Sequence, residues 1–178
     1  MKLIKNSFFL ILLIIISATG VVLLATQNHQ LSALLEYEKN PAIGDPAFLF
    51  QAKDISSNIV DIRSAYAILV FFTTKCETCI KAMPLWQQFY SELDTTKFLF
   101  VGISANPELK VRAFAEEHGL TFPIVVDEKY DILWAYHVKH FPLTIIVQPD
   151  GRMAYYQEPQ MTAKQVLAET EDFIRNLK

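Results

Sequence analysis

The sequence predicts a mixed α/β domain that follows a membrane-spanning helix. An uncharged apolar run fills most of the first thirty residues, and behind it short runs rich in Val, Ile and Phe alternate with segments of helical periodicity. The chain has 178 residues, of which 52% are hydrophobic, so one domain with a packed core fits. Its net charge of −3 lacks the basic surplus typical of nucleic-acid-binding proteins, and we expect no nucleic-acid partner.

The N-terminal residues predict a membrane anchor. Lys2 and Lys5 precede a run without formal charge that continues to residue 30. A helix rises about 1.5 Å per residue, so roughly 20 apolar residues cross a hydrocarbon core about 30 Å thick. We assign residues 1–6 to a cytoplasmic N-terminus, 7–26 to a transmembrane anchor and 27–41 to a tether. Lysines before the run and none directly after it place the following domain outside the cytoplasm.

A cleaved signal peptide is the alternative to an anchor. Such a peptide has an apolar region of about 7–15 residues followed by a small-x-small cleavage site. Here the apolar run is longer, and Ala25-Thr26-Gln27 is a poor cleavage site. We therefore expect a single-pass protein of the inner (cytoplasmic) membrane whose soluble domain faces the periplasm or the cell exterior.

Residues 42–178 are expected to form one domain around a central mixed β-sheet flanked by helices. Two continuous apolar runs predict central strands that are covered on both faces. Pro149-Asp150-Gly151 is a turn signal and predicts that the last two strands form a hairpin. The expected strands are Phe48–Ala52, Ile59–Ile62, Ile68–Thr73, Phe98–Ile103, Ile124–Val126, Leu143–Gln148 and Met153–Gln157.

Segments with apolar residues at spacings of three and four predict helices between and after these strands. The C-terminal segment has the clearest amphipathic pattern and should cover one face of the sheet. The expected helices are Glu77–Leu93, Pro107–His118, Glu128–Tyr136 and Ala163–Leu177.

The chemistry of the chain is expected at its two cysteines, Cys76 and Cys79, which form a C-x-x-C motif after a buried strand. A first sulfur at a helix N-terminus lies near unpaired N–H groups and the positive end of the helix dipole, which stabilise a thiolate. One helical turn brings the second sulfur within bonding reach. Cys76 can then attack a partner disulfide, and Cys79 can resolve the mixed disulfide.

Three other functions could use the same two sulfurs. A structural disulfide that closes so short a loop removes little entropy from the unfolded chain. A peroxidase pattern P-x-x-x-T-x-x-C would need proline where Leu69 stands, and only Thr73 matches it. Metal carriage needs further ligands, and a copper-binding metallochaperone using the cysteines plus a histidine is the main alternative function. The available histidines are His29, His118, His137 and His140.

From about Ile43 to Lys178 the sequence resembles the thioredoxin-like superfamily, and more closely its membrane-anchored TlpA/ResA/DsbE branch. Besides the C-x-x-C motif, short segments occur in the order typical of that branch. They are Gly44-Asp45-Pro46-Ala47-Phe48, Val101-Gly102-Ile103-Ser104, His118-Gly119-Leu120-Thr121-Phe122-Pro123, Asp127, Tyr136, Val138, Phe141-Pro142-Leu143-Thr144 and Asp150-Gly151.

The resemblance implies a thioredoxin-like fold and an extracytoplasmic thiol–disulfide oxidoreductase without a cofactor or metal. It implies a catalytic Pro142 in cis facing the dithiol, with Phe141 offering backbone groups to the substrate. We add Lys75, Glu77 and Thr78, which surround the cysteines, as substrate-binding residues. The partners would be disulfide-containing exported proteins, in some relatives those of cytochrome c maturation, and a membrane thiol reductant.

The chain also departs from that branch. Many relatives carry an acid at the position of Val70 or of Ala82, where a carboxylate can accept the proton of the second cysteine; both residues are apolar here. Glu77 should oppose a thiolate on Cys76, while Lys75 offsets part of that effect. We therefore expect a moderate lowering of the Cys76 pKa and a reducing protein.

Overall fold

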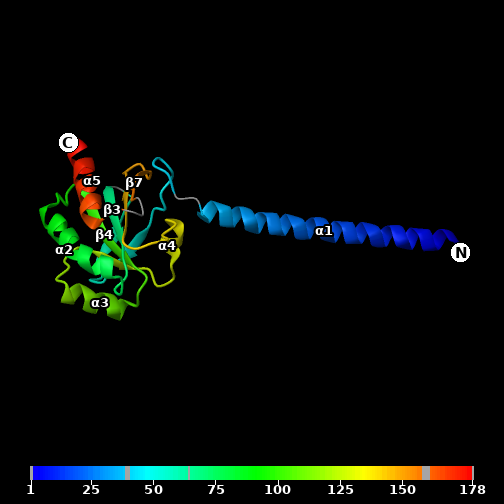
Figure 1. Cartoon of the computed structure of the whole chain (residues 1–178), viewed down its shortest axis with the longest axis horizontal. Coiled ribbons are helices and arrows are strands. Elements are labelled where there is room, and N and C mark those ends of the chain that lie inside the picture. Colours follow the sequence, from blue (N-terminus) through cyan, green and yellow to red (C-terminus); the bar gives the residue numbers. More distant parts are fainter. Residues whose placement is uncertain (1, 39–40, 64, 158–160, 178) are drawn as a thin grey trace. The chain divides into compact units, whose positions relative to one another are not determined.

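The structure of the chain, a computed structural model, describes residues 2–38, 41–63, 65–157 and 161–177. These residues divide into two units, an N-terminal helix and a domain that begins at Pro41. Each unit is described by itself. Figure 1 shows the long helix α1 and the domain with its sheet and helices.

The N-terminal unit is one helix, α1 (Lys2–Glu38). Within it the segment Ile11–Ser32 is long and apolar enough to cross a membrane, with a mean hydropathy of 2.0 and none of its residues buried. The helix continues past residue 26 through most of the segment assigned to the tether.

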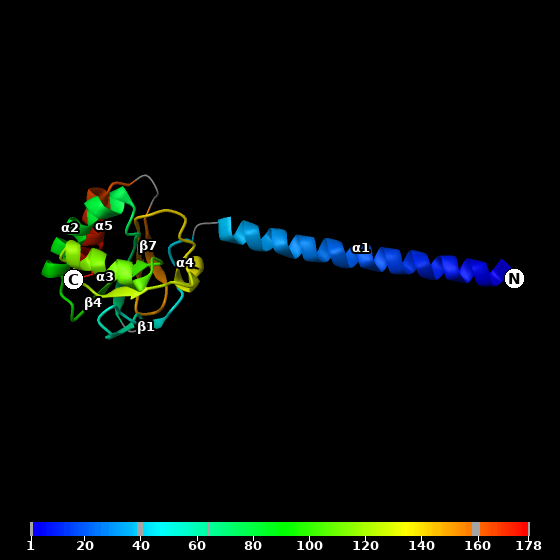
Figure 2. The same cartoon turned by 90° about the horizontal axis from the view of Figure 1, so that it is seen from below.

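The domain has the mixed α/β architecture expected from the sequence (Figures 1 and 2). A small antiparallel pair of strands precedes the main sheet. In chain order the elements are β1 (Gln51–Lys53), β2 (Ile59–Asp61), β3 (Tyr66–Phe71), α2 (Glu77–Glu92), β4 (Phe98–Ser104), α3 (Glu108–Glu117), β5 (Ile124–Val126), α4 (Asp131–Ala135), β6 (Leu143–Val147), β7 (Met153–Tyr156) and α5 (Ala163–Asn176).

The main sheet has the strand order β5-β4-β3-β6-β7, with β3 at its centre. Strand β3 pairs in parallel with β4 and antiparallel with β6, and β4 pairs in parallel with β5. Strands β6 and β7 pair antiparallel, which confirms the predicted hairpin. The central strand is fully buried from Ala67 to Phe71, as its unbroken apolar run predicts.

Alternation along the central strand divides the core into two layers. Ile68, Val70 and Phe72 pack in the layer that also contains buried residues of α2, α3 and α5. Leu69 and Phe71 pack in the other layer, with α4. Figures 1 and 2 show α2, α3 and α5 grouped on one side of the sheet and α4 on the other. The chain therefore passes from the end of β3 at Phe71 to the start of α2 at Glu77 on the side of the sheet that α2 covers.

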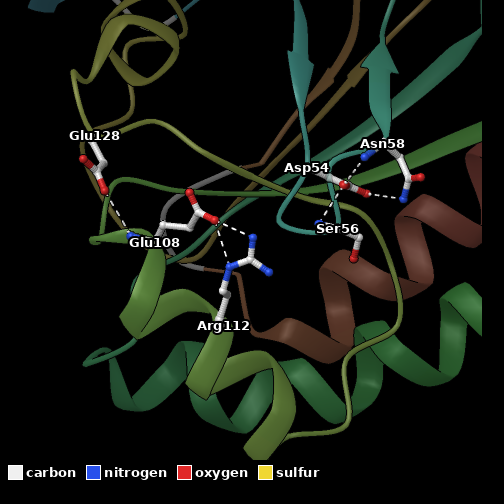
Figure 3. A network of polar contacts seen from close by, with 6 residues as sticks. All are labelled: Asp54, Ser56, Asn58, Glu108, Arg112 and Glu128. Atoms are coloured by element: carbon white, nitrogen blue, oxygen red, sulfur yellow. Dashed lines mark hydrogen bonds and ion pairs between the residues drawn. The ribbon is translucent and has the colours of Figure 1, made fainter.

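Polar contacts fix two connections of the domain, and Figure 3 shows both. The carboxylate of Asp54 accepts hydrogen bonds from the backbone N–H groups of Ser56 and Asn58, both at 2.8 Å, and shapes the turn between β1 and β2. Glu128 accepts a hydrogen bond of 3.0 Å from the N–H of Glu108, at the start of α3. Arg112 binds the carboxylate of Glu108 one turn further along α3.

Most predicted elements agree with the structure to within two residues at each end, and two begin three residues later than predicted. The predicted helix Glu128–Tyr136 is shorter, since Tyr130 has a left-handed backbone (φ 64°) and α4 starts only after it. The first predicted strand, Phe48–Ala52, is shifted towards the C-terminus. Pairing with β2 begins only at Gln51, so the first three residues of the predicted strand lie before β1. The first of them, Phe48, is 44% exposed.

Candidate active site

The helix α2 positions Cys76 as its N-cap residue. Cys76 has an extended backbone (φ −81°, ψ 114°), and its sulfur accepts a hydrogen bond of 3.2 Å from the N–H of Cys79. A side-chain acceptor at the N-cap satisfies one of the N–H groups that a helix leaves unpaired. The sequence predicts this position, because the C-x-x-C motif directly follows a buried strand.

The Cys76 sulfur is stabilised as a thiolate by short contacts within the motif. Partial burial of the thiol opposes ionisation, but hydrogen bonds from Cys79 and Thr78 outweigh it and lower the pKa of Cys76 below its usual value. The Thr78 hydroxyl oxygen lies 2.9 Å from the sulfur. Cys76 is half-buried, so a partner can reach it. The expected direction of the pKa shift is confirmed, and an N–H group at the helix N-terminus contributes to it as expected; the contribution of the Thr78 hydroxyl was not expected.

Cys79 has the opposite character. It is fully buried, and burial together with a hydrogen bond to Cys76 raises the pKa of its thiol to about 12. Val70 and Ala82 are fully buried in the same apolar layer. At neutral pH the reduced site therefore holds one reactive sulfur and one protonated sulfur in reserve.

The segment before β6 forms the other wall of the site. The Phe141–Pro142 peptide bond is cis, as the resemblance implies. The Cys76 thiol lies 3.6 Å from the carbonyl oxygen of Phe141, to which it donates. Antiparallel pairing of Phe71 in β3 with Leu143 in β6 brings this segment to the end of the strand that leads into the motif.

A contact from a distant segment holds the loop between β3 and α2. The Asn106 side-chain oxygen accepts a hydrogen bond of 2.8 Å from the N–H of Thr74. Asn106 follows the parallel neighbour β4, and its side chain also contacts the Ser104 hydroxyl at 3.3 Å. Sequence analysis did not single out Asn106. The available signal was its position after a strand that should end beside β3.

The remaining predicted site residues lie around the sulfur with different contacts. Lys75, Glu77 and Thr78 are all exposed at the start of α2. The Glu77 carboxylate binds the ammonium group of Lys81 one turn further on, at 2.6 Å. Of these three residues, only Thr78 is among the causes of the lowered Cys76 pKa. The expected rise caused by Glu77 and the expected compensation by Lys75 are not among them.

An open groove lies next to the dithiol, with a volume of about 370 Å³. Thr78 and Lys81 of α2 line it on one side, and the start of α5 lines it on another. The segment that carries the cis-proline contributes His140, Phe141 and Pro142. The groove therefore leads along the backbone edge beside the reactive sulfur.

The histidines weighed as metal ligands are spread over the structure. His118 packs against the Phe114 ring at a centroid distance of 4.4 Å, at the end of α3. His137 has a left-handed backbone (φ 51°) after α4. Within the described ranges, no three His, Cys, Asp or Glu side chains come close enough together to hold a metal ion.

Comparison with known proteins identifies the family. The AhpC/TSA family matches residues 43–156, which is more than half of the chain. The chain belongs to the AhpC/TSA family. Its thioredoxin-like fold, with a mixed sheet flanked by helices, agrees with the prediction from the sequence.

Several proteins similar to the chain carry related names. The chain is 32% identical to the sporulation thiol-disulfide oxidoreductase A of Bacillus subtilis, over 76% of this chain and 84% of the relative. It is 30% identical to the thiol-disulfide oxidoreductase ResA of Geobacillus kaustophilus, over 86% and 91%. The crystal structure of StoA from Bacillus subtilis matches with a TM-score of 0.62 and 28% identity, over 71% of this chain and 98% of StoA. This AhpC/TSA protein is a thiol–disulfide oxidoreductase.

Proposed function

We propose that the chain is a membrane-anchored reductant of disulfides in exported proteins. The observation that carries this proposal is the asymmetry of the dithiol. Cys76 is accessible and has a lowered pKa beside the Phe141 carbonyl, while Cys79 is buried with a raised pKa. An accessible thiolate starts an exchange with a foreign disulfide, and the protected thiol completes it.

The location outside the cytoplasm is supported by α1. Its apolar segment is long enough to span a bilayer, and the lysines at its start favour a cytoplasmic N-terminus. The test is protease accessibility of the full-length protein in spheroplasts. Digestion of the domain from outside is expected, and a domain protected until the membrane is lysed would contradict the topology.

Trapping of partners tests the exchange itself. In cells that express the full chain with Cys79→Ser, Cys76 can still attack, but the mixed disulfide cannot be resolved and should accumulate. Cys76→Ser is the matched control and should trap nothing. If only Cys76→Ser traps partners, the two cysteines have the opposite roles. The proteins caught would show whether apocytochromes c are among the substrates.

The direction of electron flow depends on the reduction potential. Strong oxidants of this fold owe their power to a strongly stabilised thiolate, with potentials near about −120 mV. The hydrogen bonds that stabilise a thiolate at Cys76 come from one N–H and one hydroxyl, at a partly solvated sulfur, and we expect a clearly more negative potential. Equilibration of the full chain in detergent with glutathione buffers measures it. A value near about −120 mV would reverse the proposed direction.

A further inference from the structure

Two buried polar side-chain atoms on either side of Pro142 lack a hydrogen-bond partner within the described residues. They are Nε2 of His140 and Oγ1 of Thr144. Thr144 is fully buried. Its backbone N–H donates to the Gln157 side chain at 2.9 Å, and its carbonyl accepts from the Gln157 N–H at 3.0 Å, so only the hydroxyl is left. Because buried polar groups almost always have a protein or water partner, this hydroxyl calls for one.

The strand register places the Thr144 hydroxyl on the side of the sheet that carries the dithiol. Thr144 in β6 lies directly opposite Val70 in β3. Directly opposed residues of antiparallel strands project their side chains from the same face. Val70 packs in the apolar layer that contains Cys79 and Ala82, and all three are fully buried.

The chemistry of the second step requires a proton acceptor in this layer. Cys79 must lose its proton before it attacks, and burial, the first cause of its raised pKa in the reduced site, opposes that loss. The strands β3 and β6 contain no acid or amine. The titratable groups of the motif and of the segment before β6 are Cys76, which is the reacting partner, the exposed Glu77–Lys81 pair, and His140, whose pKa burial lowers. Tyr155 of β7 packs against the same apolar layer, and its hydroxyl donates to the Met161 sulfur.

We propose that Thr144 is a positioning residue for resolution of the mixed disulfide, because its hydroxyl holds a water molecule that accepts the proton of Cys79. The proposal rests on the proposed thiol–disulfide exchange and deepens it. A buried water needs two or more polar partners, and the Thr144 hydroxyl and the Cys79 thiol supply two.

In the resolution of the mixed disulfide, each bond that forms is matched by one that breaks. The Cys79 S–H bond breaks, and its proton passes to the water and on to solvent. The Cys79 thiolate attacks the Cys76 sulfur, a Cys76–Cys79 disulfide forms, and the bond between Cys76 and the partner sulfur breaks. The partner leaves as a thiolate with the electron pair of that bond. The enzyme dithiol is oxidised by two electrons and the substrate disulfide is reduced by two.

The test follows both exchange steps in the full chain in detergent. Mixing the reduced protein with excess dithiobis(nitrobenzoate) releases one coloured thiolate when Cys76 attacks and a second when Cys79 resolves the adduct. Stopped-flow absorbance separates the two, because only the first depends on reagent concentration. The variants are Thr144→Val, which keeps the shape without the hydroxyl, and Thr144→Ser, which keeps the hydroxyl. Thr144→Ala replaces the valine variant if that one does not fold.

Thr144→Val should slow the second release about tenfold or more at neutral pH, as loss of a positioned proton acceptor does. The first release should be unchanged, and Thr144→Ser should restore the second. The deficit should shrink as pH rises, because hydroxide then takes the proton directly. Thr170→Val is the matched control. Thr170 is another buried threonine, its hydroxyl bonds the Val166 carbonyl at 2.8 Å, and its loss should leave both releases unchanged.

A Thr144→Val protein with an unaltered second release would overturn the proposal. That result, with a raised free energy of unfolding, would mean that the unpaired hydroxyl only costs stability. A deficit that is the same at every pH, or that Thr144→Ser does not repair, would also overturn it, because altered packing explains both. If the unchanged protein gave no first release, the proposed function would fail with it.

Discussion

Replacing Thr78 by valine should raise the pKa of Cys76, because the Thr78 hydroxyl lies 2.9 Å from its sulfur. Valine keeps the branched shape and removes the donor. A hydrogen bond to a charged group is worth about 1.5–3 kcal/mol, and the low end applies at a partly solvated sulfur. At about 1.4 kcal/mol per pKa unit, the expected rise is about one unit.

The assay is the rate of Cys76 alkylation by iodoacetamide as a function of pH, in a Cys79→Ser background so that one thiol reports. Thr74→Val is the control, since the contact described for Thr74 is made by its backbone N–H. An apparent pKa that moves by less than about 0.3 units in Thr78→Val would show that the N–H of Cys79 alone sustains the thiolate, and would refute the reasoning.

Three further predictions concern stability, each measured by denaturant unfolding. Asp127→Ala should cost about 1–3 kcal/mol, because its buried carboxylate accepts two N–H groups of α4 at 2.9 Å; an unchanged midpoint would contradict this. Gly102→Ala should cost about 1–3 kcal/mol, since the added Cβ would lie 2.9 Å from the Phe122 ring; a stability equal to that of the parent would show that the ring yields freely. For the reduced protein, the lowered Cys76 pKa makes stability rise with pH towards the ordinary thiol value of 9.0, and the raised Cys79 pKa makes it fall from there towards about 12. A double serine variant should lack this maximum.

Most of the fold follows from the sequence because its strands are short apolar runs. The strand predicted at Ile68–Thr73 forms at Tyr66–Phe71, and the strand predicted at Ile124–Val126 has those bounds in the structure. The start of α4 could not be placed, since it depends on the left-handed Tyr130 and on the buried carboxylate of Asp127, two features that helical periodicity does not encode. Elements whose ends are set by hydrogen bonds rather than by hydrophobic pattern are the ones that sequence misplaces.

At the site, too, some features can be predicted from the sequence and others depend on contacts that only the fold creates. The proposed roles of Cys76 and Cys79 follow from their spacing and from the strand that precedes them. The partners of Cys76 required the structure, because the Phe141 carbonyl is 65 residues away in sequence and the Thr78 hydroxyl competes with solvent. Charges adjacent in sequence suggested that Glu77 acts on the sulfur, but a helical turn offers it Lys81 as a partner instead.

The unequal proton affinities of the two sulfurs also determine how the driving force of the enzyme responds to acidity. Between the pKa of Cys76 and that of Cys79, two electrons enter the oxidised site with one proton, so the potential changes by about 30 mV per pH unit. A substrate whose two thiols both take up protons changes by about 59 mV. Within that range, each unit of acidification shifts the exchange about tenfold towards reduced substrate, so the protein becomes a more effective electron donor as the pH falls towards the pKa of Cys76.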